Sequence, residues 1–352
     1  MQINTFKHYG LLGIIILLLT IACTCGSPTE PLPVVEKEYP IYYFNRANSK
    51  GSYLFTYYPN TQNVDSTIIQ WDPDALSVSS DGKLLYLTLS TSIVIIESET
   101  KSFVTELHYT TTDVIVSSPD NRMIAILGDT LRILRASDYQ IIYSDSGLTY
   151  SGIFSNDSKE FYCGYRDTSS FYIVYKLDIA NEQFSKSTKQ ILDRGIVSVK
   201  PTLDKSKWLL HDSYGFEVYD VAQDSIVFQD RLLNGYGNTA LTKDGKKVFC
   251  TDPGRPGNPS TVDPIIKVYD VENYRIDKIL DSLLLFSDDS SWLSNPKDLV
   301  ITPDNKYVAV LGGATNYNVF FLFDVNTYEL VDRINYLSNQ YTLTNLGVQN
   351  TK

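Results

Sequence analysis

The amino-acid sequence predicts an all-β fold, a seven-bladed β-propeller, and two observations carry this prediction. One pattern occurs six times: an apolar strand, a polar turn that contains an aspartate, and a second apolar strand. The aspartates are Asp81, Asp120, Asp157, Asp204, Asp244 and Asp304, at spacings of 39, 37, 47, 40 and 60 residues. A period near 40 residues, with short strands and without a helical pattern, is typical of a propeller with one blade per repeat.

Each repeat divides into four strands, which we name A to D in chain order. In the last repeat they read DLVIT, YVAVL, NVFFLFD and LVDRI. The repeat aspartate lies in the A–B turn, where a following Gly or Asn supplies the left-handed backbone of a tight hairpin. A second set of aspartates is expected to cap the C–D turns: Asp178, Asp220, Asp270 and Asp324. Because both sets recur around the ring, we interpret them as structural and not as catalytic.

The two ends of the chain complete one further blade. Three strands precede the first complete repeat and correspond to strands B, C and D of a blade without an A strand. A strand-like segment, YTLTNLGV at residues 341–348, follows the last repeat. Pairing this segment with the first blade removes an open sheet edge, which is a liability in a soluble sheet. The sequence therefore predicts a propeller over residues 40–350 that is closed by its C-terminal strand.

The N-terminus is predicted to be a targeting segment, with a signal peptide at residues 1–22 and a flexible tether at residues 23–39. The apolar run Leu11–Ala22 is shorter than the roughly 20 residues of a membrane-spanning helix, and it ends directly before Cys23. This ending resembles the lipobox of bacterial lipoproteins, which implies that Cys23 carries a lipid. A secreted protein without lipid and an uncleaved anchor are the alternatives. Because Thr24 follows the cysteine, the resemblance favours the outer membrane of the cell envelope, facing either the periplasm or the surface.

Composition and motifs restrict the chemistry of the protein. The formal net charge of −11 argues against nucleic acid as a partner, because nucleic-acid binding depends on basic side chains. Cys163 and Cys250 occupy apolar positions of B strands in different blades, so we expect two buried thiols and not a disulfide. No His or Cys spacing suits zinc and there is no cofactor motif, so neither a metal nor a cofactor is expected. Calcium at the acidic pair Asp288-Asp289 is the alternative, although the pair lacks the spacing of a dedicated calcium loop. The pair His211-Asp212 is interpreted as an exposed turn, with an acid/base pair as the alternative.

The last repeat carries a resemblance to a known group of proteins. Residues 294–331 (SNPKDLVITPDNKYVAVLGGATNYNVFFLFDVNTYELV) resemble the YVTN-type and WD-like repeats of bacterial extracytoplasmic propellers. The shared features are Asn-Pro before strand A, Pro-Asp in the A–B turn and Asp-x-x-Thr at the C–D corner. The other five repeats keep the turn but lose most of these residues. The resemblance implies a rigid scaffold without one characteristic reaction, so it does not define a function.

The longest connections are expected on one face of the ring, in the sixth and seventh blades. They are Thr251–Asp263, Asp281–Asn295 and Gly312–Asn318. Long loops on a rigid frame often carry binding sites, although a solvated insertion or a loop packed on the blades is the simpler interpretation. Trp, Tyr and Arg dominate binding hot spots, so Arg255, Trp292 and Tyr317 are the candidate anchors.

We therefore expect a non-catalytic, lipid-anchored propeller that binds a protein, peptide or glycan. The alternative is a propeller enzyme of the lactonase or quinoprotein type that works in the central channel. Such an enzyme needs His, Arg and acidic side chains at the starts of the A strands. In this chain those positions hold Ala75, Asp113, Gly152, Val197, Thr239 and Asp298.

Overall fold

The computed structural model of the protein describes eleven segments of the chain. They are residues 37–47, 52–109, 112–166, 172–190, 196–212, 215–231, 238–252, 265–280, 296–314, 317–337 and 341–348. The chain divides into two compact units, Met1–Glu38 and Tyr39–Lys352, and every described strand belongs to the second. The predicted signal peptide and Cys23 lie outside the described residues. Within these segments, no helix has the length and apolar character that crossing a membrane requires.

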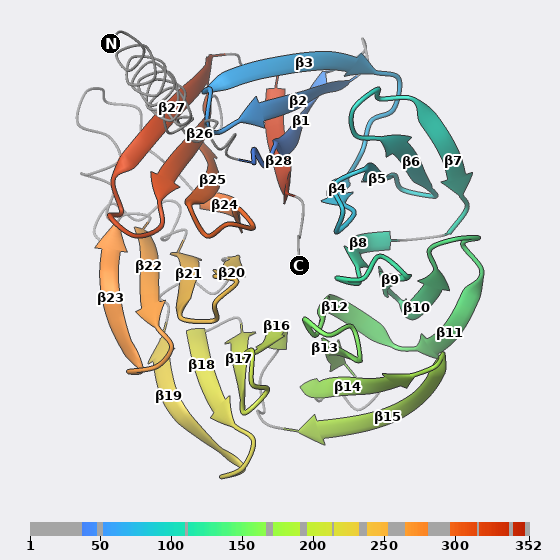
Figure 1. The fold of residues 1–352 in the computed structure, drawn as a ribbon, viewed down its shortest axis with the longest axis vertical. Coiled ribbons are helices and arrows are strands. Elements are labelled where there is room, and N and C mark those ends of the chain that lie inside the picture. The colour runs from blue at the N-terminus through green and yellow to red at the C-terminus, as the bar shows by residue number, and fades with distance from the viewer. Residues whose placement is uncertain are drawn as a thin grey trace, which may run out of the picture. The chain divides into compact units, whose positions relative to one another are not determined.

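The described strands of Tyr39–Lys352 form seven four-stranded antiparallel sheets in a ring (Figure 1). Each blade is given from its innermost strand outward. The first blade contains β28 (Tyr341–Val348), β1 (Ile41–Ala47), β2 (Ser52–Tyr58) and β3 (Asn63–Ile69). The second contains β4 (Ala75–Val78), β5 (Leu84–Thr88), β6 (Ile93–Glu97) and β7 (Phe103–Leu107). The third contains β8 (Thr112–Ser117), β9 (Met123–Gly128), β10 (Thr130–Arg135) and β11 (Ile141–Ser146).

The remaining four blades follow the same order, so the predicted fold class is confirmed. The fourth contains β12 (Leu148–Phe154), β13 (Glu160–Arg166), β14 (Tyr172–Ala180) and β15 (Gln183–Gln190). The fifth contains β16 (Ile196–Pro201), β17 (Lys207–Asp212), β18 (Gly215–Asp220) and β19 (Ser225–Arg231). The sixth contains β20 (Thr239–Leu241), β21 (Lys247–Asp252), β22 (Ile265–Asp270) and β23 (Arg275–Leu280). The seventh contains β24 (Pro296–Ile301), β25 (Tyr307–Ala314), β26 (Tyr317–Asp324) and β27 (Leu330–Leu337).

The ring closes through the first blade, as the sequence predicts. Strand β28 pairs antiparallel with β1, from Ile41 opposite Val348 to Ala47 opposite Tyr341. The register shifts once, between Tyr43 and Phe44. Because β28 is the innermost strand of a blade whose other strands come from the N-terminal side, both ends of the propeller are tied into one sheet (Figure 1).

The repeat aspartates hold the A–B turns. In all six turns, a Ser or Thr hydroxyl two residues earlier donates a hydrogen bond of 2.6–2.8 Å to the aspartate Oδ1. The backbone N–H two residues later donates to the same oxygen at 3.0–3.2 Å. The residue after the aspartate has φ between 57° and 76° in every copy, including Ser158 and Lys205, which replace the expected Gly or Asn. The predicted structural role is confirmed.

The C–D aspartates agree with their predicted role in three of the four cases. Asp220, Asp270 and Asp324 each accept two backbone hydrogen bonds of 2.7–3.0 Å from the turn that follows. The prediction is wrong for Asp178, whose carboxylate pairs instead with the Lys176 ammonium at 2.9 Å. The strands β14 and β15 continue past this position, so the chain turns only at residues 181 and 182.

The hydrophobic core lies between neighbouring blades and is built mainly from their B and C strands. One cluster joins the fifth and sixth blades through Leu209, Phe216, Val248 and Tyr269. Cys163 and Cys250 are fully buried free thiols in this core, as predicted. The predicted open loop Gly312–Asn318 is mostly strand, because Ala314 pairs directly with Tyr317.

Candidate binding site at the turn face of the central channel

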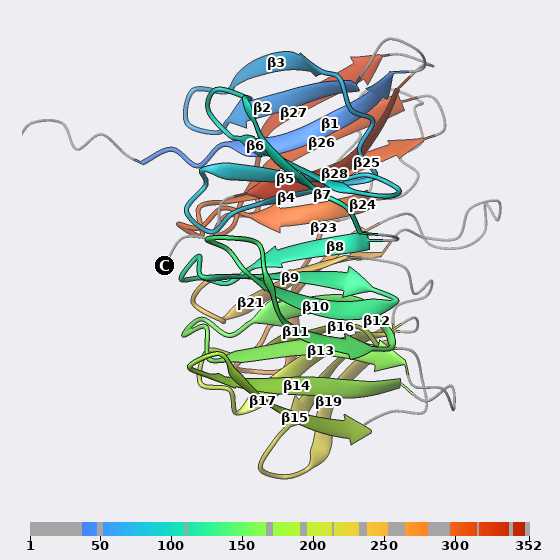
Figure 2. The same cartoon turned by 90° about the vertical axis from the view of Figure 1, so that its right-hand side faces the viewer.

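A cavity of about 540 Å³ lies at the end of the central channel where the A–B turns gather. Figure 2 views the ring from the side, with its strands running between the two faces. The A–B and C–D turns form the face that we call the turn face, and the B–C and D–A connections form the loop face. The third to seventh blades line the cavity through the ends of their innermost strands and the turns that follow. We call this cavity the turn-face cavity.

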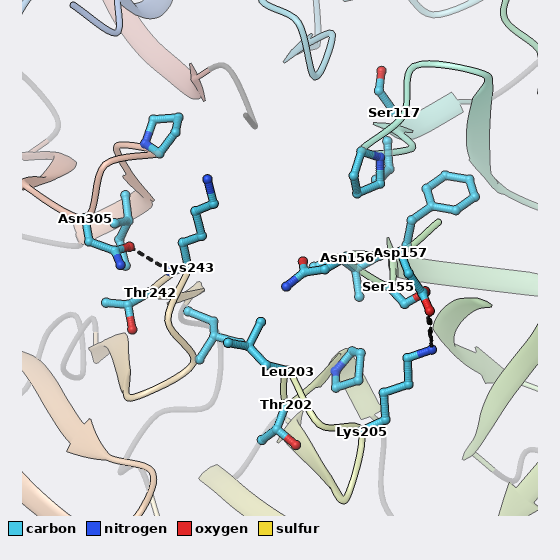
Figure 3. A pocket seen from close by; sticks show the side chains of 18 of the residues that line it. Ser117, Ser155, Asn156, Asp157, Thr202, Leu203, Lys205, Thr242, Lys243 and Asn305 are labelled. Atoms are coloured by element: carbon cyan, nitrogen blue, oxygen red, sulfur yellow. Dashed lines mark hydrogen bonds and ion pairs between the residues drawn. The ribbon is translucent and has the colours of Figure 1, made fainter. Parts of the chain in front are cut away.

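The residue immediately before each repeat aspartate belongs to the wall of this cavity in five blades. These residues are Pro119, Asn156, Leu203, Lys243 and Pro303. Figure 3 shows Asn156, Leu203 and Lys243 extending into the cavity from different sides. Their direction follows from the turn, because the aspartate next to each of them is held back by its hydroxyl and backbone partners. Leu203 is 48% exposed, so it offers apolar surface at the cavity.

The charged groups of the cavity wall differ in how they are compensated. The Lys205 ammonium lies 3.1 Å from the Asp157 carboxylate (Figure 3). It also contacts the Glu160 carboxylate. Burial acts to raise the pKa of Asp157, but hydrogen bonds from Ser155 and Lys205 outweigh it and lower this pKa to about 2. Asp157 and Lys205 therefore largely neutralise each other.

Lys243 is different. Its backbone N–H donates a 2.6 Å hydrogen bond to the Asn305 side chain in the next blade. Its ammonium group has no hydrogen-bond or ion-pair partner among the residues that the structure describes, and neither does the side-chain amide of Asn156. The cavity thus combines one uncompensated cation and one free amide with apolar walls.

A second polar group lies between the inner strands of the fifth, sixth and seventh blades. The Lys200 ammonium donates a hydrogen bond to the Thr239 carbonyl, and the Asn238 amide donates one to Asp298 Oδ1 at 2.9 Å. An equivalent link joins the second and third blades, where the Ser77 hydroxyl donates to the Ile115 carbonyl at 2.6 Å. Burial lowers the pKa of Lys200 to about 8. This position in the A strand therefore connects neighbouring blades.

His211 lies close to this group and corrects the sequence interpretation. It is a residue of β17, opposite Ser198 and Phe216, and only 2% of its surface is exposed. The expected exposed turn is wrong, because the strand continues through this position to Asp212. Neither ring nitrogen has a hydrogen-bond partner among the described residues. Burial, and then the charge of Lys200, lower the pKa of His211 to about 4.

The three predicted anchors are not brought together by the described residues. Arg255 and Trp292 lie outside them. Tyr317 begins β26, where it pairs with Ala314 and Leu337, and the position of its side chain is also outside the description. The loop-face site stays a prediction.

The residues of the turn-face cavity were missed by the sequence interpretation, although a signal was present. The position before each repeat aspartate varies freely between copies, whereas the Ser or Thr and the aspartate around it are constant. A variable position inside an otherwise constant turn indicates a side chain that the fold does not require. Within the described segments, no three His, Cys, Asp or Glu side chains are grouped so that they could hold a metal ion.

The fold defines the protein as a seven-bladed β-propeller, and the solved structures that it resembles agree. A candidate 6-phosphogluconolactonase from Bacteroides fragilis is 14% identical, with a TM-score of 0.65 over 90% of this chain and 99% of that one. The β-propeller domain of Cps50 (Swd1) from Myceliophteria thermophila is 14% identical, with a TM-score of 0.62 over 77% and 88% of the two chains. The dihydro-heme d1 dehydrogenase NirN is 13% identical, with a TM-score of 0.58 over 86% and 74%. Identities this low demonstrate the fold alone. No protein-family model and no curated protein matches the chain.

Proposed function

We propose that the protein is a non-catalytic binding propeller that a lipid on Cys23 anchors in the cell envelope and that holds a protein, peptide or glycan partner. The lipid and the location rest on the N-terminal sequence. The binding role rests on the chemistry of the channel and on the closed, rigid ring. Rigid scaffolds that carry variable turns and loops are a common basis for binding.

The observation that carries this proposal is the lowered pKa of Asp157, the acidic residue in the cavity wall, and the occupation of its carboxylate by neighbouring donors. A general acid or base works best when its pKa is near the operating pH. The pKa of Asp157 is lowered to about 2, and the carboxylate is occupied by Ser155, the Lys159 backbone and Lys205. The groups that remain available in the wall, Lys243, Asn156 and Leu203, suit recognition.

One observation favours an enzyme of the lactonase or quinoprotein type as the second candidate. The lowered pKa values of Lys200 and His211, about 8 and about 4, are of the kind that often marks a functional site. Two of the similar structures also carry the names of enzymes. His211 is nevertheless buried between blades and Lys200 is half-buried there. The Lys200 ammonium is also used in a link between blades that the second blade makes with a serine.

The binding function is tested with the full chain, crosslinked in cells and captured from detergent-solubilised membranes. We expect one partner to be captured in a constant ratio, and we expect its purified form to bind the purified propeller in a saturable titration. A triple variant, Arg255→Ala, Trp292→Ala and Tyr317→Ala, asks whether the loop face is the binding face. Phe103→Ala is the matched control, because Phe103 is a 56% exposed aromatic residue on the outer strand β7.

The enzyme alternative is tested with the same protein against a panel of lactones and in a dye-linked oxidation assay. We expect no turnover above that of heat-denatured protein. Turnover by the wild type that disappears in Lys200→Met would overturn the non-catalytic proposal.

A further inference from the structure

The turn-face cavity offers a binding site whose ligand chemistry can be worked out from its walls. The inference rests on the proposed binding function and names a class of ligand for the turn face. The volume of about 540 Å³ falls within the range of roughly 300–1,000 Å³ that is typical of ligand sites.

The charge of the cavity selects an anion. Asp157 and Lys205 form an ion pair, so the Lys243 ammonium is the cation of the wall that has no partner among the described residues. Figure 3 shows this side chain and the Asn156 side chain both directed into the open space. A lysine is a point charge with three donors, and no arginine, whose bidentate fork favours phosphate, is among the described residues that line the cavity. One ammonium and one amide match a single carboxylate.

The apolar walls select what the carboxylate is attached to. Leu203 is 48% exposed at the cavity, and Pro119, Pro201 and Pro303 line it with rigid rings. Covering an exposed leucine removes apolar surface from water, which favours a complex. Sugar rings are usually held by stacking on an exposed aromatic ring. Phe154, the aromatic residue among the lining residues, is only 3% exposed, so the walls favour an aliphatic side chain over a sugar.

We propose that the turn-face cavity binds the C-terminal end of an extended peptide. The terminal carboxylate pairs with the Lys243 ammonium and accepts a hydrogen bond from the Asn156 amide. The last side chain of the peptide, an aliphatic one, packs against Leu203 and the neighbouring prolines.

The test is calorimetric titration of the full chain, purified in detergent, with two synthetic peptides. One is N-acetyl-Ala-Ala-Leu with a free carboxylate, and the other is its C-terminal amide. We expect the free acid to bind at least tenfold more tightly than the amide. We expect Lys243→Gln to abolish this preference, because it removes the cation but keeps a polar side chain of similar length. Lys246→Gln is the matched control, since Lys246 is an exposed lysine of the same turn and does not line the cavity.

Four results would overturn the inference: no binding of the acid at millimolar concentration, equal binding of acid and amide, an unchanged preference in Lys243→Gln, or an equal loss in Lys246→Gln. The inference would also be overturned, in favour of a phosphate site, if inorganic phosphate displaced the free-acid peptide at a lower concentration than acetate does. These outcomes are separate from the proposed function. If a membrane partner is captured by wild type and by Lys243→Gln alike while the peptide fails to bind, the peptide site is wrong and the binding function stands.

Discussion

Protonation of His211 should make the propeller measurably less stable in mild acid. In the unfolded chain this imidazole takes up a proton below its ordinary pKa of about 6.5. In the folded protein, burial and the nearby Lys200 lower its pKa to about 4. The unfolded state therefore binds the proton first, and the stability that neutral His211 contributes is complete above pH 6.5 and declines between pH 6.5 and 4.

The magnitude follows from the difference between the two pKa values. One pKa unit corresponds to about 1.4 kcal/mol. The full loss is thus about 3 kcal/mol at pH 4 and about 2 kcal/mol at pH 5. The repeat acids with the lowest pKa values, Asp157 and Asp204 at about 2, lose their contribution only below the ordinary carboxyl pKa of about 4. The interval from pH 7.5 to 5 therefore isolates the histidine.

The assay is denaturant unfolding at pH 7.5 and at pH 5.0, followed by tryptophan fluorescence. One of the three tryptophans, Trp208, is 8% exposed and stacks on Tyr219. His211→Met removes the titrating group and keeps a flexible side chain of similar volume, so at pH 7.5 it should change stability by less than about 1.5 kcal/mol. Between the two pH values it should lose about 2 kcal/mol less than the wild type. His108→Gln, at an exposed histidine, should behave like the wild type. If His211→Met is as acid-sensitive as the wild type, the proposed origin of the pH dependence is wrong.

Three further predictions test the fold and the anchor. Deleting residues 341–352 removes β28 and leaves β1 as an open edge, so the melting temperature should fall markedly and light scattering should show aggregation; a monomer with unchanged melting would contradict this closure of the ring. Gly152→Ala would place a Cβ 2.3 Å from the Phe161 ring and 2.9 Å from Leu127, so it should destabilise the protein by about 1–3 kcal/mol in denaturant unfolding. Cys23→Ser should lose labelling by a fatty-acid analogue in cells, and equal labelling of variant and wild type would refute lipidation.

Much of the fold could be predicted because it depends on contacts that are short in sequence. Each A–B turn is held by a Ser or Thr, an aspartate and one backbone N–H within a few residues, so the turn can be recognised from its local sequence. The apolar strands on both sides of the turn then define the blade. The closure of the ring could also be predicted. Three strands of an incomplete blade precede the repeats, and one further strand, which belongs to no repeat, follows them.

The sequence by itself determined the number of blades, the turns and the pairing of the chain ends, whereas only the tertiary structure decided which side chains face the channel and which are buried between blades. The sequence around His211 predicts an exposed turn, but the register of β17 buries the ring beside Lys200 of β16. Lys243 looks like one lysine among several, but its place in the turn directs it into the cavity (Figure 3). The physical reason is distance along the chain: these surroundings join residues from different blades, and no local pattern encodes the side chains that will meet there.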